Sequence, residues 1–146
     1  PKRKFRWLFA IEGIDSFLIK TAARPKMNTE ELEMPFINSY RYVAGRTKFD
    51  QINVTLYDAI APSGMQQVME WVRTAHESTT GRDGYADFYK KDFDIFVLGP
   101  VGDKVENWKV KGAYIKVAQF GDLDWATETQ VEIQLTIGLD YCMLEY

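Results

Sequence analysis

The sequence predicts a mostly β fold, a two-sheet antiparallel β-sandwich or barrel with one flanking α-helix. The first observation is the segment 127–140, in which apolar residues at odd positions alternate with polar residues at even positions. Because successive side chains of a strand point to opposite faces, this segment has one apolar face and one hydrated face. Segment 51–57 repeats the design, with Ile52, Val54 and Leu56 on its apolar side. The third observation is a single helical pattern without βαβ alternation.

Length and composition favour one domain, residues 1–146, with a real hydrophobic core. The single Cys142 excludes an internal disulfide framework and is typical of assembly in a reducing compartment. No segment resembles a signal peptide and no apolar run reaches about 18 residues, so no membrane span is expected.

The net charge of −3 is unevenly distributed along the chain. No Lys or Arg follows Lys116, whereas six carboxylates do, and four of the first six residues are basic. Two interpretations stay open. The ends of the chain could form complementary surfaces between copies, or the asymmetry could be ordinary solvated charge.

The first third of the chain predicts strands and a projection. Residues 5–11 alternate, and residues 17–22 follow a turn, so the two segments predict a hairpin. Residues 31–37 predict a short strand, which Pro35 restricts to an edge or a bulge. Residues 38–50 are polar and basic, and they predict either a hairpin projecting from the body or a long loop. Long ordered loops commonly have a function.

One helix is predicted over residues 63–78. Ser63 and Gln66 have the spacing of a capping box. The apolar residues recur at spacings of three and four: Met65, Val68, Met69 and Val72. Trp71 lies beside this stripe. We expect it in the core or at its rim, with a contact to another subunit as the alternative.

The second half predicts three further strands, for a total of about seven. They cover residues 87–98, residues 105–118 and the segment 127–140, with residues 120–125 turning the chain back. Unbroken alternation over 105–118 would put Val110 and Ala113 on opposite faces.

Candidates for chemistry are few. His76 is the only histidine, and we expect it to act at the end of the helix rather than as a base or ligand. Asp92 and Asp94 share a strand face, but no apolar pocket or paired base is visible near them. We expect no catalytic, cofactor-binding or metal-binding residues. The acidic and amide-rich strand faces also argue against phosphate binding.

Two segments together resemble a known family. Residues 43–72 contain a glycine-bearing projection, an aromatic–acidic pair, a V-T strand, an acidic turn and a helix ending in tryptophan. Residues 108–141 contain a strand with K-G-A, a turn with L-D-W and a long alternating strand ending in L-D-Y. In order and spacing these features resemble the tail tube proteins of contractile-tailed bacteriophages, over roughly residues 36–142.

The resemblance implies a structural virion protein whose six-subunit rings share a large β-barrel and stack into the inner tail tube. The projection at residues 38–50 would be the inter-ring contact, through Tyr40, Arg41, Tyr42, Arg46 and Lys48. The hydrated strand faces would line the bore, through Gln51, Asn53, Thr55, Glu128, Gln130, Glu132 and Gln134. An acidic bore would let DNA pass with little adhesion.

The partners implied are further copies of the chain, a tail sheath protein, and baseplate and tail terminator proteins, with DNA only as passing cargo. The location implied is the virion tail, after assembly in the host bacterial cytoplasm. The alternatives are a baseplate tube-initiator or terminator relative and the tube of a phage-like injection system. A β-sandwich binding or hydrolytic module is a further alternative from another class.

Overall fold

The computed structural model describes residues 1–60, 64–77 and 80–145 of the chain. Strands dominate these residues, and α1 (Gly64–Ala75) is the long helix among them, beside the short α2 (Ala86–Tyr89) and the 3-10 turn η1 (Ser16–Leu18). The strands are β1 (Trp7–Ile11), β2 (Ile19–Ala22), β3 (Met27–Phe36), β4 (Ser39–Phe49), β5 (Ile52–Tyr57), β6 (His76–Glu77), β7 (Arg82–Asp83), β8 (Lys91–Leu98), β9 (Lys104–Gln119), β10 (Glu132–Gly138) and β11 (Tyr141–Glu145). No helix of this part of the chain is long and apolar enough to cross a membrane.

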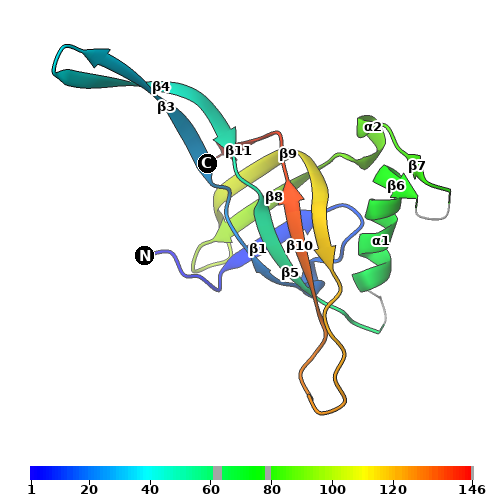
Figure 1. Ribbon diagram of the computed structural model, residues 1–146. Helices are drawn as coiled ribbons and strands as arrows, with labels where there is room; N and C mark the ends of the chain where they lie inside the picture. The colour runs from blue at the N-terminus through cyan, green and yellow to red at the C-terminus, as the bar shows by residue number, and fades with distance from the viewer. Residues whose placement is uncertain (61–63, 78–79, 146) are drawn as a thin grey trace.

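Two antiparallel sheets share the long strand β9 (Figure 1). The first half of β9 lies between β8 and β11, and β1 is the outer neighbour of β8. The second half pairs with β10, followed by β5 and then β2. The predicted fold class, two antiparallel β-sheets with one flanking helix, is confirmed. The strand order β1-β8-β9-β10-β5-β2 leaves β1 and β2 as its two ends.

β9 serves both sheets because it changes face at a bulge. Gly112 has a φ of +68°, and near it the register with β8 shifts between Lys91 and Phe93. As a result Val110 and Ala113 are both fully buried. The predicted placement of these two residues on opposite faces is therefore wrong, because one extra residue in a strand reverses the orientation of every side chain after it.

The core lies between the sheets and is built by the alternating strands. Ile52, Val54 and Leu56 of β5 are buried, as are Ile133, Leu135 and Ile137 of β10, so the apolar faces predicted for both segments are confirmed.

The strand predicted over residues 127–140 is, however, shorter than expected. β10 begins only at Glu132, opposite Tyr57, the last residue of β5. Residues 127–131 therefore have no adjacent strand to continue the ladder and belong to the connection from β9. Asp58 N–H still bonds to the Val131 carbonyl.

The predicted opening hairpin is wrong. β1 pairs with β8, and β2 pairs with β5, so the two segments join different sheets. Ile11 and Ile14 form an isolated bridge at the turn. Local turn signals alone could not show that tertiary partners would separate the two strands.

Helix α1 covers one end of the sheets (Figure 1). It spans Gly64–Ala75, and the predicted helical residues His76 and Glu77 form β6 instead. The predicted cap Ser63 and residue 78 lie outside the described residues. The buried face is Gly64, Val68 and Trp71, whereas Met65 is exposed. Trp71 is a core residue whose Nε1–H donates to the Tyr89 carbonyl at 2.7 Å, which answers the question left open for it.

Candidate functional site

A two-stranded hairpin, β3–β4, projects from the body and contributes nothing to the buried core (Figure 1). The predicted projection at residues 38–50 is its second strand, and the predicted strand 31–37 is part of its first. All ten residues of β3 are exposed. Both faces of the hairpin are therefore open in the single chain. An isolated two-stranded hairpin is only marginally stable in water, so we expect this one to pack against a partner surface.

The cross-strand register sorts the hairpin into two faces. Leu32 opposes Val43, and Met34 opposes Arg41, so with Phe36 they form a largely apolar face. On the other face Glu33 opposes Tyr42 and Pro35 opposes Tyr40. The exposed apolar residues of the hairpin are Met27, Leu32, Met34, Phe36, Ile37, Tyr40, Tyr42 and Val43.

The five residues predicted for inter-ring contact all lie on β4 and are exposed: Tyr40, Arg41, Tyr42, Arg46 and Lys48. Lys48 pairs with Glu30 at 3.1 Å. The sequence reasoning missed the opposing apolar residues Leu32, Met34 and Phe36. Their alternation is readable in the sequence, but Pro35 limited the segment to a short edge strand.

The hydrated face of β5 and β10 is one continuous polar surface. Gln134 lies opposite Thr55 on one side and Gln119 on the other. Thr136 Oγ1 and Asn53 Oδ1 are 3.3 Å apart, which ties the two strands together. Nearby, Lys116 Nζ donates to Gln51 Oε1 at 3.2 Å. The predicted bore residues Gln51, Asn53, Thr55 and Gln134 thus lie close together on one side.

The other three residues predicted to line the bore, Glu128, Gln130 and Glu132, are placed differently. Glu132 is on the same strand as Gln134, but it forms an ion pair with Lys20. This hydrogen bond raises the pKa of Lys20. Glu128 and Gln130 lie in the connection between β9 and β10, not on the strand. The polar face is therefore dominated by amides and hydroxyls rather than by free carboxylates.

The connection between β9 and β10, residues 120–131, is named here the acidic loop. It contains Asp122, Asp124 and Glu128 and no basic residue. The backbone N–H of Ala126 bonds to Asp124 Oδ1 at 3.0 Å, and the Thr127 hydroxyl donates to Asp124 Oδ2 at 3.1 Å. These bonds lower the pKa of the Asp124 carboxyl. These bonds hold the loop in a defined turn and favour the ionised form of Asp124.

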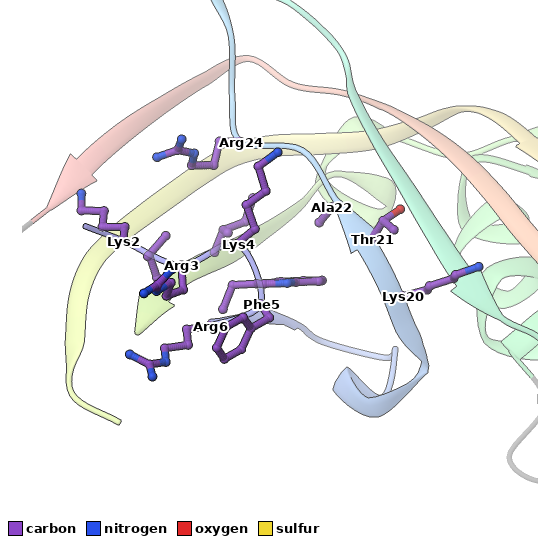
Figure 2. Close-up of a pocket in the computed structure, with 12 residues that line it drawn as sticks. Lys2, Arg3, Lys4, Phe5, Arg6, Lys20, Thr21, Ala22 and Arg24 are labelled. Carbon is purple, nitrogen blue, oxygen red and sulfur yellow. The ribbon is translucent and has the colours of Figure 1, made fainter. Parts of the chain in front are cut away.

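A basic pocket of about 660 Å³ lies between the two end strands, β1 and β2. Figure 2 shows its cationic side chains coming from the N-terminal segment and from β2 with the residues after it. The lining residues are 2–7, 20–22, Arg24, Ile95 and Val97.

Glu106 ties the rim of this pocket together. It is 5% exposed, receives hydrogen bonds from Lys2 and the Trp108 indole, and pairs with Arg24 at 3.2 Å. Burial works to raise its pKa, but the hydrogen bonds from Lys2, Trp108 and Arg24 outweigh burial, so the pKa of the carboxyl is lowered. Lys2 and Arg24 are therefore paired with a carboxylate of the same chain.

The residues considered for chemistry are arranged as ordinary surface groups. The Gly112 N–H and Lys111 bond to Asp92 at 3.1 and 3.3 Å and lower its pKa, which is the opposite of what a general acid requires. Asp94 lies opposite Lys109 in the sheet. His76 is exposed and contacts Asp83 at 2.8 Å. Within the described residues no group of three or more potential ligands could hold a metal ion.

An open β-sandwich with unpaired end strands and a projecting hairpin is typical of a subunit of a larger assembly. The family model described as T4-like virus tail tube protein gp19 matches residues 3–143. The chain belongs to this family of structural tail tube proteins. No curated protein matches the chain significantly.

Solved structures of contractile injection systems share the fold. The chain is similar to the tube-terminating cap of the anti-feeding prophage, with 16% identity, a TM-score of 0.80 and coverage of 99% of this chain and 91% of that one. The sheath/tube terminator of the extracellular contractile injection system PVC has 12% identity, a TM-score of 0.80 and coverage of 100% and 97%. The PVC sheath–tube complex in its extended state has 13% identity and a TM-score of 0.74, with coverage of 99% of this chain and 91% of that one. These neighbours agree with the family match: the chain is a structural protein of the tail-tube type.

Proposed function

We propose that six copies of this chain close into a ring and that the rings stack into the inner tube of a contractile tail. A sheath protein surrounds this tube, baseplate and terminator proteins hold its ends, and DNA passes through it on delivery to the host. The chain catalyses no reaction, and it assembles in the bacterial cytoplasm before it becomes part of the virion.

The observation that best supports this proposal is the β3–β4 hairpin. Apolar side chains on a projecting hairpin with two open faces would cause non-specific aggregation unless a defined partner covers them. In a stack of rings the partner is another copy of the chain. Tyr40, Arg41, Tyr42, Arg46 and Lys48 then contact the adjacent ring from β4, and Leu32, Met34 and Phe36 join them from β3.

The end strands support ring closure. Among the described strands, β1 pairs only with β8, and β2 pairs only with β5. Joining such edges between six copies produces one closed barrel and removes the unpaired backbone groups. Head-to-tail contacts of this kind form a closed ring when the rotation between copies is sixfold.

The polar face of β5 and β10 supports a water-filled bore. Gln51, Asn53, Thr55 and Gln134 offer amides and a hydroxyl without net charge, and the Lys20–Glu132 pair is neutral overall. Lys116, which donates to Gln51, adds one cation beside them. A surface without a strong field neither binds nor strongly repels a passing polyanion. Glu128 and Gln130 lie in the acidic loop, beyond the strand, and are not part of this face.

A terminator role is the second candidate, because a tube-terminating cap and a sheath/tube terminator are among the similar structures. The tube of a phage-like injection system is a third. A terminator ends a tube, whereas a tube protein polymerises without limit. The two roles therefore differ in the length of the polymer that the chain forms.

Electron microscopy of the purified chain tests the proposal, with and without its sheath and baseplate partners. Tubes of stacked six-fold rings are expected. Single rings that cap a tube made of another protein would favour the terminator role. Monomers alone, with sheath and baseplate present, would refute polymerisation.

A further inference from the structure

Among the described residues after Lys116, the side-chain carboxylates without an ion-pair partner all lie in the acidic loop. Of the six carboxylates after Lys116, three are paired within the chain: Glu132 with Lys20, Asp140 with Lys90 at 2.9 Å, and Glu145 with Lys109 at 3.4 Å. The other three are those of the acidic loop, and none of them forms an ion pair with a described residue.

The acidic loop also presents its apolar side chains to water. Trp125 is fully exposed and Leu123 is 87% exposed, on either side of Asp124. Tryptophan is the residue most enriched among the dominant contacts of protein interfaces, together with tyrosine and arginine. The hydrogen bonds of Asp124 fix the turn in advance, which lowers the entropy cost of binding.

The basic pocket has the complementary properties. Arg3, Lys4 and Arg6 line the pocket and form no ion pair with any described residue, so their number equals that of the unpaired carboxylates of the loop. The pocket wall includes the aromatic and aliphatic side chains of Phe5, Trp7, Ile95 and Val97. A volume of about 660 Å³ is ample for an indole ring.

In this structure the acidic loop does not occupy the pocket of the same copy, because Leu123 and Trp125 are exposed and lie outside the pocket lining. The acidic loop extends beyond the end of the sheet where Tyr57 pairs with Glu132, away from the N-terminal segment (Figure 1). The pocket lies between β1 and β2 and continues to Arg24, at the base of the projecting hairpin (Figure 2). Lys20 at one edge of the pocket pairs with Glu132, the residue after the loop, so the base of the loop lies near the pocket while its tip extends away from it. A loop tip and a pocket that face different directions produce a head-to-tail contact.

We propose that the acidic loop of one copy docks into the basic pocket of a neighbouring copy, with Trp125 and Leu123 inserted and the loop carboxylates facing Arg3, Lys4 and Arg6. This contact is separate from the hairpin and rests on the proposed self-assembly. Its partner is a second copy of this chain.

The first test is Trp125→Ala, with Phe17→Ala as the control for an exposed aromatic side chain outside the loop. The concentration at which half of the chain is assembled is measured by sedimentation. Trp125→Ala is expected to raise it by about tenfold or more, whereas Phe17→Ala leaves it unchanged. Equal effects of the two variants would overturn the proposal.

The second test reverses charges on both surfaces. Asp122→Lys with Glu128→Lys alters the loop, and Arg3→Glu with Arg6→Glu alters the pocket. Each pair should weaken assembly by about tenfold, and all four in one chain should restore it, because attraction is regained with opposite signs. Glu70→Lys on the exposed side of α1 is the control. If the variant with all four substitutions shows the summed assembly defects of the two double variants, the contact is refuted.

These results separate the contact from the proposed function. If the unaltered chain fails to assemble, the proposed function fails. If it assembles and the loop and pocket variants assemble equally well, only this inference fails. Loss of duplex DNA binding by the pocket variant, with assembly unaffected, would assign the pocket to nucleic acid and overturn the proposal.

Discussion

At the scale of single residues, Glu106 joins the N-terminal segment to the body. Its carboxylate is buried and receives bonds from Lys2, Arg24 and Trp108. Glu106→Gln removes the charge and keeps the shape. We expect a loss of about 1 kcal/mol in the free energy of unfolding at neutral pH, since the two cationic partners are themselves largely exposed.

The same residue gives a pH dependence with a definite sign. The pKa of Glu106 is lower in the folded chain than in the unfolded one, so its contribution is full above the unfolded pKa and is lost as the pH falls through the folded pKa. Urea unfolding of the unaltered chain and of Glu106→Gln should show that the difference in their free energies of unfolding shrinks from neutral pH to about pH 3. A difference constant over that range would contradict the ionised pairing.

Gly112 is the residue that allows β9 to serve two sheets. A Cβ at this position would overlap the Asp140 carboxylate, and its φ of +68° is unfavourable for any other residue. Gly102→Ala is the matched control, because Gly102 has a φ of +83° but nothing within 4 Å of a new Cβ. We expect a loss of about 1 kcal/mol for the control and of about 3 kcal/mol for Gly112→Ala, measured by urea unfolding. Equal losses would show that the overlap relaxes without cost.

At the scale of elements, the hairpin is separable from the domain. Replacing residues 32–43 by a two-residue turn should leave the thermal unfolding of the subunit unchanged, because no core residue lies in that segment. The same change should prevent the stacking of rings, because it removes Tyr40, Tyr42 and the opposing apolar face. Circular dichroism and electron microscopy provide the two measurements. Long tubes from the shortened chain would refute the stacking role.

The polar face of β5 and β10 makes its own prediction. Asn53→Lys with Gln134→Lys places two cations on a face that has little net charge. Tubes should form normally, and DNA release from assembled particles should slow, since phosphates would then bind the wall. Glu70→Lys on the exposed side of α1 is the control, because it changes the total charge of the chain by the same amount as the two substitutions together. Unchanged release would place this face outside the bore.

The sequence predicted elements best where one strand face meets the core. Ile52, Val54 and Leu56, like Ile133, Leu135 and Ile137, follow their pattern because burial enforces a period of two. The predictions failed at Gly112 and at the opening hairpin, where tertiary pairing decided the register and the partner. From the sequence, Trp125 is only part of the L-D-W turn, because an alternation pattern says nothing about an exposed side chain in a loop.

At the scale of the whole molecule, the strands leave an unfinished barrel whose ends, β1 and β2, flank the basic pocket. Amide hydrogen exchange can show whether neighbouring copies complete this barrel in the assembled tube. In dilute subunits the outer amides of β1, β2 and the β3–β4 hairpin should exchange quickly, because they lack ladder partners. In assembled tubes they should become protected, whereas the amides of β5 and β10 should be protected already in the single chain, because these strands pair with each other. Edge amides that exchange equally fast in both states would show that neighbouring copies meet through side chains alone, without a shared barrel.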